Sequence, residues 1–349
     1  MFDAKILSRL SLVAFTLLPV AGFGHHTLLG YDQSRLIELE GQVTAVFWRN
    51  PHVRLTVRVT DDAGERHWTV EGMSVNAMER AGISQAIVSP GDQIQLSGHL
   101  SSVYENTLQP VSVRLEDGQI VVLNEESATA FGLIVTNSGT VRDSAPSTAI
   151  DTVERNVTGI FRVWTNRDRH WLRDVREWWA RVHPLTESAQ LALSDWDQET
   201  DDFAARCIPA GMPEAMLMPF PIEFVDGGDE IFLRIEEWDN TRTIHLAATN
   251  NDRAPYSPLG HSVGRWDRNT LIVETNRINY PYFNDQGIPQ SQDVEIVEHF
   301  TFSENNTRLD WTATVVDPKT FTEPITMPDL HWDWVPGQEI KPYNCTVDD

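Results

Sequence analysis

Short stretches in which apolar and polar residues alternate recur along most of this 349-residue chain. Between Val53 and Val59 every second residue is apolar and those between are polar, and the same alternation returns between Leu309 and Val315. Such alternation predicts strands with one buried face. Turn motifs rich in Gly and Asp, such as residues 226–229, lie between apolar stretches and favour antiparallel hairpins. The sequence therefore predicts a mainly β protein.

Residues 25–124 are expected to form a first domain. Their patterns follow the order strand, strand, strand, helix, strand, strand, with Ser74 as the N-cap of a short helix that stops at Gly82. This order is typical of a small OB-like barrel. Some OB folds bind oligonucleotides, but the chain has 51 acidic and 27 basic residues and a formal net charge of -24. Because affinity for nucleic acid depends on cationic side chains, we expect no nucleic-acid partner.

A polar segment, residues 125–157, is predicted to link this domain to a second domain at 158–349. Helical periodicity predicts two helices at the start of the second domain, one over 166–183 and one from Thr186 to about Ala205.

From Ile222 onward, successive hairpin patterns predict an antiparallel β-barrel or a curved sheet, since closure removes exposed strand edges. Barrels of this kind often enclose a ligand cavity. Ten of the twelve tryptophans lie after residue 158, which indicates that the two domains have differently built interiors.

The first 24 residues have the pattern of a signal peptide. Lys5 and Arg9 precede an apolar run from Leu10 to Val20, and small residues follow. The sequence therefore predicts a periplasmic or secreted protein. The apolar run is too short to span a membrane and no later stretch is long enough, so no membrane span is expected.

Export makes an oxidising compartment the expected location of the folded chain. The two cysteines, Cys207 and Cys345, can pair only with each other within one chain. We expect this disulfide, with two free buried thiols as the alternative.

A histidine pair stands at the predicted mature N-terminus. If cleavage follows Gly24, the α-amine and imidazole of His25 could chelate a metal ion together with His26, and His52 or His99 could supply a further ligand. Nitrogen ligands of this kind suit copper or zinc. The alternative is an N-terminus without a metal. The chain has no CxxC or HExxH motif.

A second candidate site is a polar cluster on three strand regions of the second domain. Its members are the catalytic candidates His261, Glu237 and Glu298 and the ligand-binding candidates Arg242, Arg265, Trp238 and Trp266. Antiparallel neighbours could bring these side chains into one barrel mouth or interior. There a histidine near a carboxylate would act as acid and base, an arginine would hold an anionic group, and indole rings would supply apolar walls. The alternative is that the charged residues face solvent.

Two parts of the chain resemble families of exported bacterial proteins of unknown function. About residues 25–123 resemble one family through His25-His26-Thr27, Asn50-Pro51-His52 and Ser97-Gly98-His99, with Thr27 where that family typically has Ser. The resemblance of about residues 185–345 to a second family is carried by three pieces: residues 207–213, residues 260–266 and Asp317-Pro318. Residues 247–250 replace an Asp-Gly-Arg turn usual there. Neither resemblance implies an activity.

Two functions of different class are consistent with these patterns. The first is an exported binding or accessory protein with a small-molecule cavity in the second domain and a metal at its N-terminus. The alternative is a lyase, isomerase or hydrolase that uses the His/Glu/Arg cluster. A purely structural envelope protein is a third option. The sequence does not indicate whether the chain has a protein partner.

Overall fold

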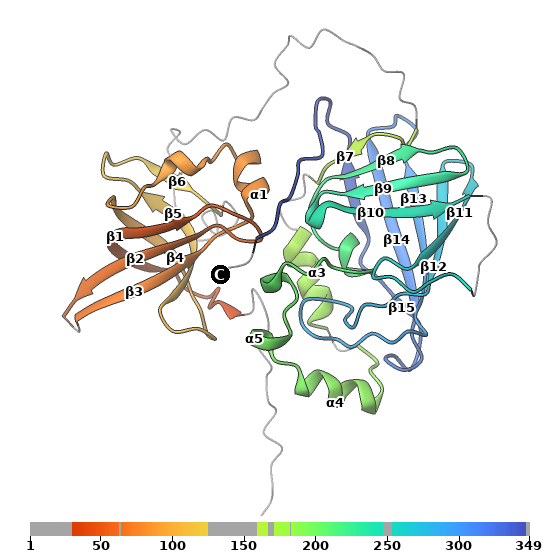
Figure 1. Cartoon of the computed structure of the whole chain (residues 1–349), viewed down its shortest axis with the longest axis horizontal. Coiled ribbons are helices and arrows are strands. Elements are labelled where there is room, and N and C mark those ends of the chain that lie inside the picture. The colour runs from red at the N-terminus through yellow and green to blue at the C-terminus, as the bar shows by residue number, and fades with distance from the viewer. Residues whose placement is uncertain are drawn as a thin grey trace, which may run out of the picture.

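The computed structural model describes residues 30–62, 64–124, 159–166, 171–181, 183–246 and 253–346. The protein is mainly β, as predicted, and consists of a small closed barrel and a larger curled sheet (Figure 1). The predicted signal peptide, the histidine pair at 25 and 26, and the whole predicted linker lie outside the described residues.

The small barrel follows the predicted order of elements. These are β1 (Ile37–Phe47), β2 (Arg54–Asp61), β3 (Gly64–Glu71), α1 (Val75–Arg80), β4 (Gln93–Leu100), β5 (Thr107–Arg114) and β6 (Ile120–Val122). The sheet order is β3-β2-β1-β4-β5-β6, and a parallel pairing of β3 with β5 closes five strands into a barrel. Ser74 caps α1 as predicted, because its side chain accepts a hydrogen bond from the backbone N–H of Ala77 at 3.2 Å.

The larger region contains the remaining elements. These are β7 (Val163–Trp164), α3 (Trp171–Trp179), α4 (Glu187–Asp195), α5 (Gln198–Asp201), β8 (Ile222–Asp226), β9 (Glu230–Ile235), β10 (Asn240–His245), β11 (His261–Asp267), β12 (Thr270–Asn276), β13 (Glu295–Phe302), β14 (Arg308–Val316), β15 (Ile325–Thr326) and β16 (Leu330–Asp333). The sheet runs in the order β15-β14-β13-β12-β11-β10-β9-β8-β7, and β16 pairs with β14. Thr165 and Asp333 exchange two backbone hydrogen bonds of 2.9 Å. These bonds join the end of the sheet at β7 to β16, which lies beside β14 near the other end.

One strand pair departs from the predicted antiparallel arrangement. β10 and β11 run parallel, with Ile244 opposite Ser262 and His245 opposite Val263. A parallel pair requires a crossover connection, and residues 246–260 are long enough to provide one. The pairing of β10 with β11 is limited to the two residue pairs given above.

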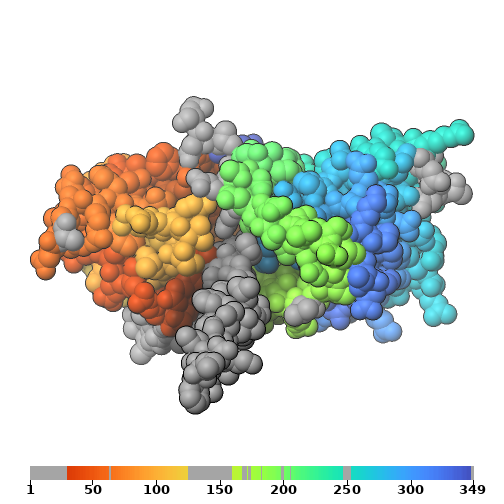
Figure 2. Space-filling model, turned by 90° about the horizontal axis from the view of Figure 1, so that it is seen from below, coloured from red at the N-terminus to blue at the C-terminus, as the bar shows by residue number. Residues whose placement is uncertain are grey.

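The two predicted helices are shorter in the structure. α3 covers Trp171–Trp179, and α4 begins with Thr186 as its N-cap but ends at Asp195 rather than near Ala205. Trp196 has an extended backbone, and its indole lies so close to Gly287 that a Cβ on the glycine would come within 2.2 Å of the ring. Tertiary packing of Trp196 thus ends the helix. Figure 2 shows the helical segment, in green, at the side of the larger region next to the small barrel.

The two cysteines form the predicted disulfide. Cys207 and Cys345 are bonded, with Cα atoms 5.7 Å apart. The bond ties the segment that follows the helices to the C-terminal segment.

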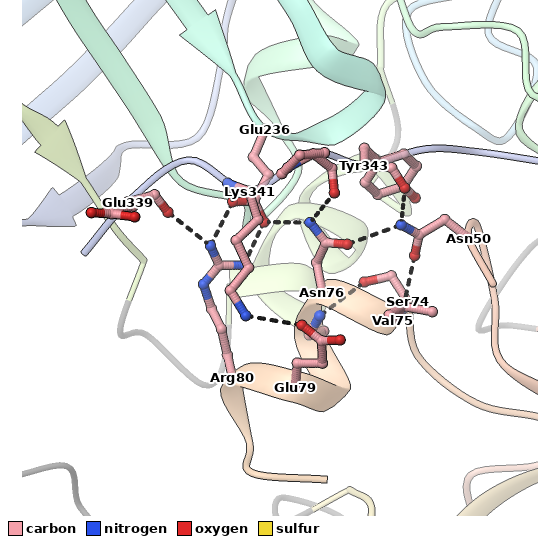
Figure 3. A network of polar contacts seen from close by, with 12 residues as sticks. Asn50, Ser74, Val75, Asn76, Glu79, Arg80, Glu236, Glu339, Lys341 and Tyr343 are labelled. Atoms are coloured by element: carbon pink, nitrogen blue, oxygen red, sulfur yellow. Dashed lines mark hydrogen bonds and ion pairs between the residues drawn. The ribbon is translucent and has the colours of Figure 1, made fainter. Parts of the chain in front are cut away.

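A buried carboxylate joins the two regions (Figure 3). Glu236, at the end of β9, is completely buried and accepts hydrogen bonds from both terminal nitrogens of Arg80, from the Asn76 side chain at 3.0 Å, and from the backbone N–H of Lys341 at 2.8 Å. Arg80 and Asn76 belong to α1 of the small barrel. The C-terminal segment therefore lies between the two regions and is held by both.

A second set of contacts at this interface involves the Asn-Pro-His motif (Figure 3). The side chain of Asn50 donates to the carbonyl oxygen of Tyr343 and to Asn76 at 2.9 Å, and it accepts from the backbone N–H of Val75 at 2.8 Å. Thr346 donates its backbone N–H to the Asn50 carbonyl at 3.2 Å. In the structure, Asn50 therefore attaches the C-terminal segment to the barrel.

Candidate functional site

A cleft of about 530 Å³ opens where β10 and β11 diverge. β11 begins only at His261, so its pairing with β10 is limited to Ile244 and His245 of that strand. Four segments line the cleft: residues 203–209, β10, residues 257–261 and residues 279–281. The volume lies in the range of about 300–1,000 Å³ that is usual for small-molecule sites.

The walls of the cleft combine apolar and polar groups. Phe203, Ile208, Leu259 and the ring of Tyr280 provide apolar surface, and Phe203 packs edge-to-face on Tyr280 with ring centroids 5.7 Å apart. Threonine, serine and asparagine side chains and two histidines supply hydrogen-bonding groups. The cleft can therefore enclose a partly apolar molecule and orient its polar atoms.

The two histidines lie next to each other. The rings of His245 and His261 have centroids 4.9 Å apart. Glu230 is directly opposite His245 on β9, and its carboxylate lies 2.9 Å from Nδ1 of His245. Burial, and secondarily the neighbouring His245, lowers the pKa of His261. His261 is thus neutral at neutral pH.

Arg242 and Glu298 form an ion pair inside the curled sheet. Their side chains are 1% and 0% exposed. The guanidinium group contacts both carboxylate oxygens and also donates to Ser262 at 2.9 Å and to Thr275 at 2.6 Å, while Trp311 donates to Glu298 at 3.0 Å. A buried ion pair with so many hydrogen bonds holds strands together and leaves little capacity for a ligand.

His261 and Glu298 therefore do not form the predicted acid–base pair. Adjacent residues of a strand point to opposite faces, and Ser262 points inward to Arg242. His261 consequently faces outward into the cleft, while Glu298 stays inside the sheet. The cluster predicted from the sequence is divided between the two faces.

Glu237 belongs to a different group of buried side chains. It is 5% exposed, and burial, followed by the charge of Asp285, raises its pKa to about 8. Burial also raises the pKa of Glu214, whose carboxylate accepts a hydrogen bond of 2.9 Å from the hydroxyl of Tyr280. Both carboxyl groups interact electrostatically with Tyr280, whose ring lines the cleft. Glu237 is therefore a buried acid near the cleft but not part of its lining.

The other predicted ligand-binding residues lie outside the cleft lining. Trp238 packs on Tyr343 with ring centroids 5.1 Å apart. Arg265 is exposed, and Trp266 is 39% exposed and contacts the ring of Phe161. Of the predicted ligand-binding residues, only Arg242 borders the cleft.

The predicted third metal ligands have other contacts. His52 is exposed, with Nδ1 3.1 Å from the carbonyl oxygen of Gly72. His99 is fully buried in the small barrel, with Nδ1 3.1 Å from the carbonyl oxygens of Asp32 and Arg35. Within the described ranges, no group of three or more His, Cys, Asp or Glu side chains is arranged to hold a metal ion. The metal site at His25 and His26 stays a prediction.

Sequence reasoning missed His245 and Tyr280 as cleft residues. His245 lies on the same face of β10 as Thr243, and this alternation was visible in the sequence. Its pairing with His261 depends on the parallel junction of β10 and β11, which has no local sequence signal. Tyr280 comes from a loop, where no periodicity applies.

Fold and site together define a mainly β protein with a closed small barrel, a larger curled sheet and a cleft beside that sheet. Residues 14–106 match the model of a family described as a family of unknown function, DUF6152. This match supports the predicted resemblance of the N-terminal region to a family of unknown function. A comparison with curated proteins finds no match. In the described part of the chain, no helix is long and apolar enough to cross a membrane.

Proposed function

We propose that this protein is an exported binding protein that holds a small organic ligand in the cleft beside β10. The cleft itself is the observation that carries this proposal, because its volume and its mixed lining suit a molecule of modest size. The predicted signal peptide and the Cys207–Cys345 disulfide support export to an oxidising compartment.

The charges around the cleft favour an uncharged, partly apolar ligand. Arg242 is neutralised by Glu298, His245 is paired with Glu230, and His261 is neutral. An ionic ligand would have to leave water without gaining a free counter-charge, which is unfavourable. Hydroxyl or carbonyl groups on the ligand would bind the imidazoles and the hydroxyl side chains.

Native mass spectrometry of the full chain, expressed with its own N-terminal segment, tests this proposal. We expect an additional organic mass on the wild type. Thr241→Trp should remove it, because Thr241 is exposed and lines the cleft. Thr312→Trp is the matched control, since Thr312 is exposed on β14 outside the cleft. An organic mass retained by Thr241→Trp would place the ligand elsewhere. The same spectra report whether cleavage follows Gly24.

A second candidate is an enzyme of lyase, isomerase or hydrolase type. It is favoured by the neutral His261 in the cleft and by the buried acid Glu237 near Tyr280. Once a bound molecule is identified, His261→Ala and Glu237→Gln should abolish its turnover but not its binding. Retained turnover in both variants would eliminate this candidate.

Three further interpretations stay predictions. They are the resemblance of residues 185–345 to a second exported family, a copper or zinc ion at His25 and His26, and a purely structural role in the envelope. The mass spectra described above report on the metal directly, and a protein with neither a metal nor an organic ligand would favour the structural role.

A further inference from the structure

Three side chains with electron-pair donors lie on the outward face of the sheet at the junction of β10 and β11. His261 is directly opposite Asn276 in the antiparallel pairing of β11 with β12, and such pairs have Cβ atoms about 4.5–5.5 Å apart on the same face. The His245 ring lies 4.9 Å from that of His261. The three residues therefore form one compact group beside the cleft.

Two donor atoms of this group have no hydrogen-bond partner among the described residues. They are Nε2 of His261 and Oδ1 of Asn276, and both atoms are buried. Buried polar atoms are nearly always partnered. Lone pairs on two residues that stand opposite each other, and that accept no hydrogen bond within the described part of the chain, are suited to a cation.

The surroundings of His245 also suit a metal ion. The carboxylate of Glu230, 2.9 Å from Nδ1 of His245, provides the second contact that commonly orients a metal-binding histidine. With Nδ1 occupied in this way, Nε2 of His245 is left for the metal.

We infer that His245, His261 and Asn276 bind a divalent copper or zinc ion at the wall of the cleft. Two imidazole nitrogens and one amide oxygen match the ligand preferences of these ions. Three protein ligands leave at least one coordination position open to the cleft. The inference deepens the proposed function, because an organic ligand in the cleft could occupy that position.

Isothermal titration of the full chain with zinc sulfate or copper sulfate tests this site. The chain is first stripped with a chelator and carries His25→Ala and His26→Ala, which remove the predicted N-terminal chelate. We expect one ion per chain. His261→Ala and His245→Ala should each weaken binding more than 100-fold, and Glu230→Gln, which acts through His245, should weaken it about 10- to 100-fold.

His299→Ala is the matched control, because His299 is exposed on β13 of the same sheet. It should bind the ion like the parent. Circular dichroism and thermal unfolding establish that each variant is folded, and His261→Gln provides a second replacement of similar size. Copper bound to the parent should show two imidazole nitrogens by electron paramagnetic resonance, and only one after His261→Gln.

Absence of binding in the parent, or equal affinity of the parent and both histidine variants, would overturn the metal site. A chain that binds no metal but retains an organic mass that Thr241→Trp removes would overturn the metal site alone. A chain that binds the metal but carries no organic mass would contradict the proposed function alone.

Discussion

The two β regions of this protein are closed in different ways. In the small barrel, strands β3 and β5 pair directly and complete a ring of five strands. In the larger region, the backbone pairing that closes the curled sheet consists, within the described residues, of the two hydrogen bonds between Thr165 and Asp333. The small ring thus has a continuous wall, whereas the larger sheet has a weak seam and a cleft where β10 and β11 diverge.

The interiors of the two regions also differ in the kinds of side chain that fill them. Aliphatic side chains such as Val57, Leu96 and Leu108 fill the small barrel, with Trp68 as its one buried tryptophan. The larger interior contains Trp164, Trp311 and the Arg242–Glu298 pair. A barrel with more strands is wider, so aliphatic side chains no longer reach across it. The larger region therefore depends on a few large or charged side chains and on cross-links.

Replacing Glu298 should cause the largest loss in the free energy of unfolding. In Glu298→Leu, Arg242 would be an unpaired charge that is 1% exposed, and the free energy of unfolding should fall by about 3–5 kcal/mol. Urea unfolding followed by tryptophan fluorescence reports this region, since ten of the twelve tryptophans follow residue 158. The double variant Arg242→Met/Glu298→Leu should recover most of the loss. Equal losses in the single and the double variant would show that the charge is not responsible.

Removing the disulfide should cause the next largest loss in the free energy of unfolding. The bond closes 138 residues, for which loop entropy sets a limit of about 5 kcal/mol, and we expect Cys207→Ser/Cys345→Ser to lose about 3 kcal/mol. Thermal unfolding without reductant measures this. Both cysteines lie outside the small barrel, so its unfolding should change less than that of the larger region, although Asn50 contacts the segment that contains Cys345. A wild type whose melting is unaffected by a dithiol reductant would contradict this prediction.

Arg80→Ala tests how strongly the two regions depend on each other. Glu236 is fully buried and would lose its charged partner, so we expect a loss of about 2 kcal/mol. The matched control is Arg66→Ala, because the pair of Arg66 with Asp61 is on the exposed surface of the small barrel and should be worth less than about 1 kcal/mol. If both variants melt alike in calorimetry, the interface contributes little to stability.

The smallest predicted step in stability, taken per pH unit, is a dependence on pH that only the larger region should show. The pKa of Glu237 is raised from 4.5 to about 8 in the folded protein, so between these values the folded chain keeps a proton that the unfolded chain loses. The stabilisation is complete below pH 4.5 and is lost as the pH rises toward 8. Near pH 7 the slope should be about 1 kcal/mol per pH unit.

Glu237→Gln provides the comparison for this dependence. The amide cannot ionise, so the variant should lose stability less steeply than the wild type between pH 6 and 8 in denaturant titrations. Parallel curves for the two proteins would contradict the raised pKa of Glu237. The described part of the small barrel has no buried carboxyl group and should contribute no such slope.

Much of the fold could be predicted from local patterns. The hairpins of β8 with β9 and of β13 with β14 follow from alternation and turn residues, because both signals lie within a few positions of each other. Thr186 was recognisable as a cap for the same reason. The disulfide was predictable because the chain has two cysteines.

The residues of the candidate site were harder to predict from local sequence patterns. The sequence suggested one pocket for His261, Arg242 and Glu298. However, a shift of one residue in the strand register moves a side chain to the other face of the sheet. The parallel junction of β10 and β11 sets that register. The motif around Asn50 was interpreted as part of a metal site, whereas the structure shows Asn50 bound to the C-terminal segment.

The sequence by itself determined that this protein is mainly β, that its first region is a small barrel, and that its two cysteines pair. Alternation, turn chemistry and composition are local properties, and they suffice for these features. Only the tertiary structure decided that β10 and β11 run parallel, that a cleft opens between them, and that His245, His261 and Asn276 lie together. These features depend on contacts between distant segments, whose free energies no local pattern encodes.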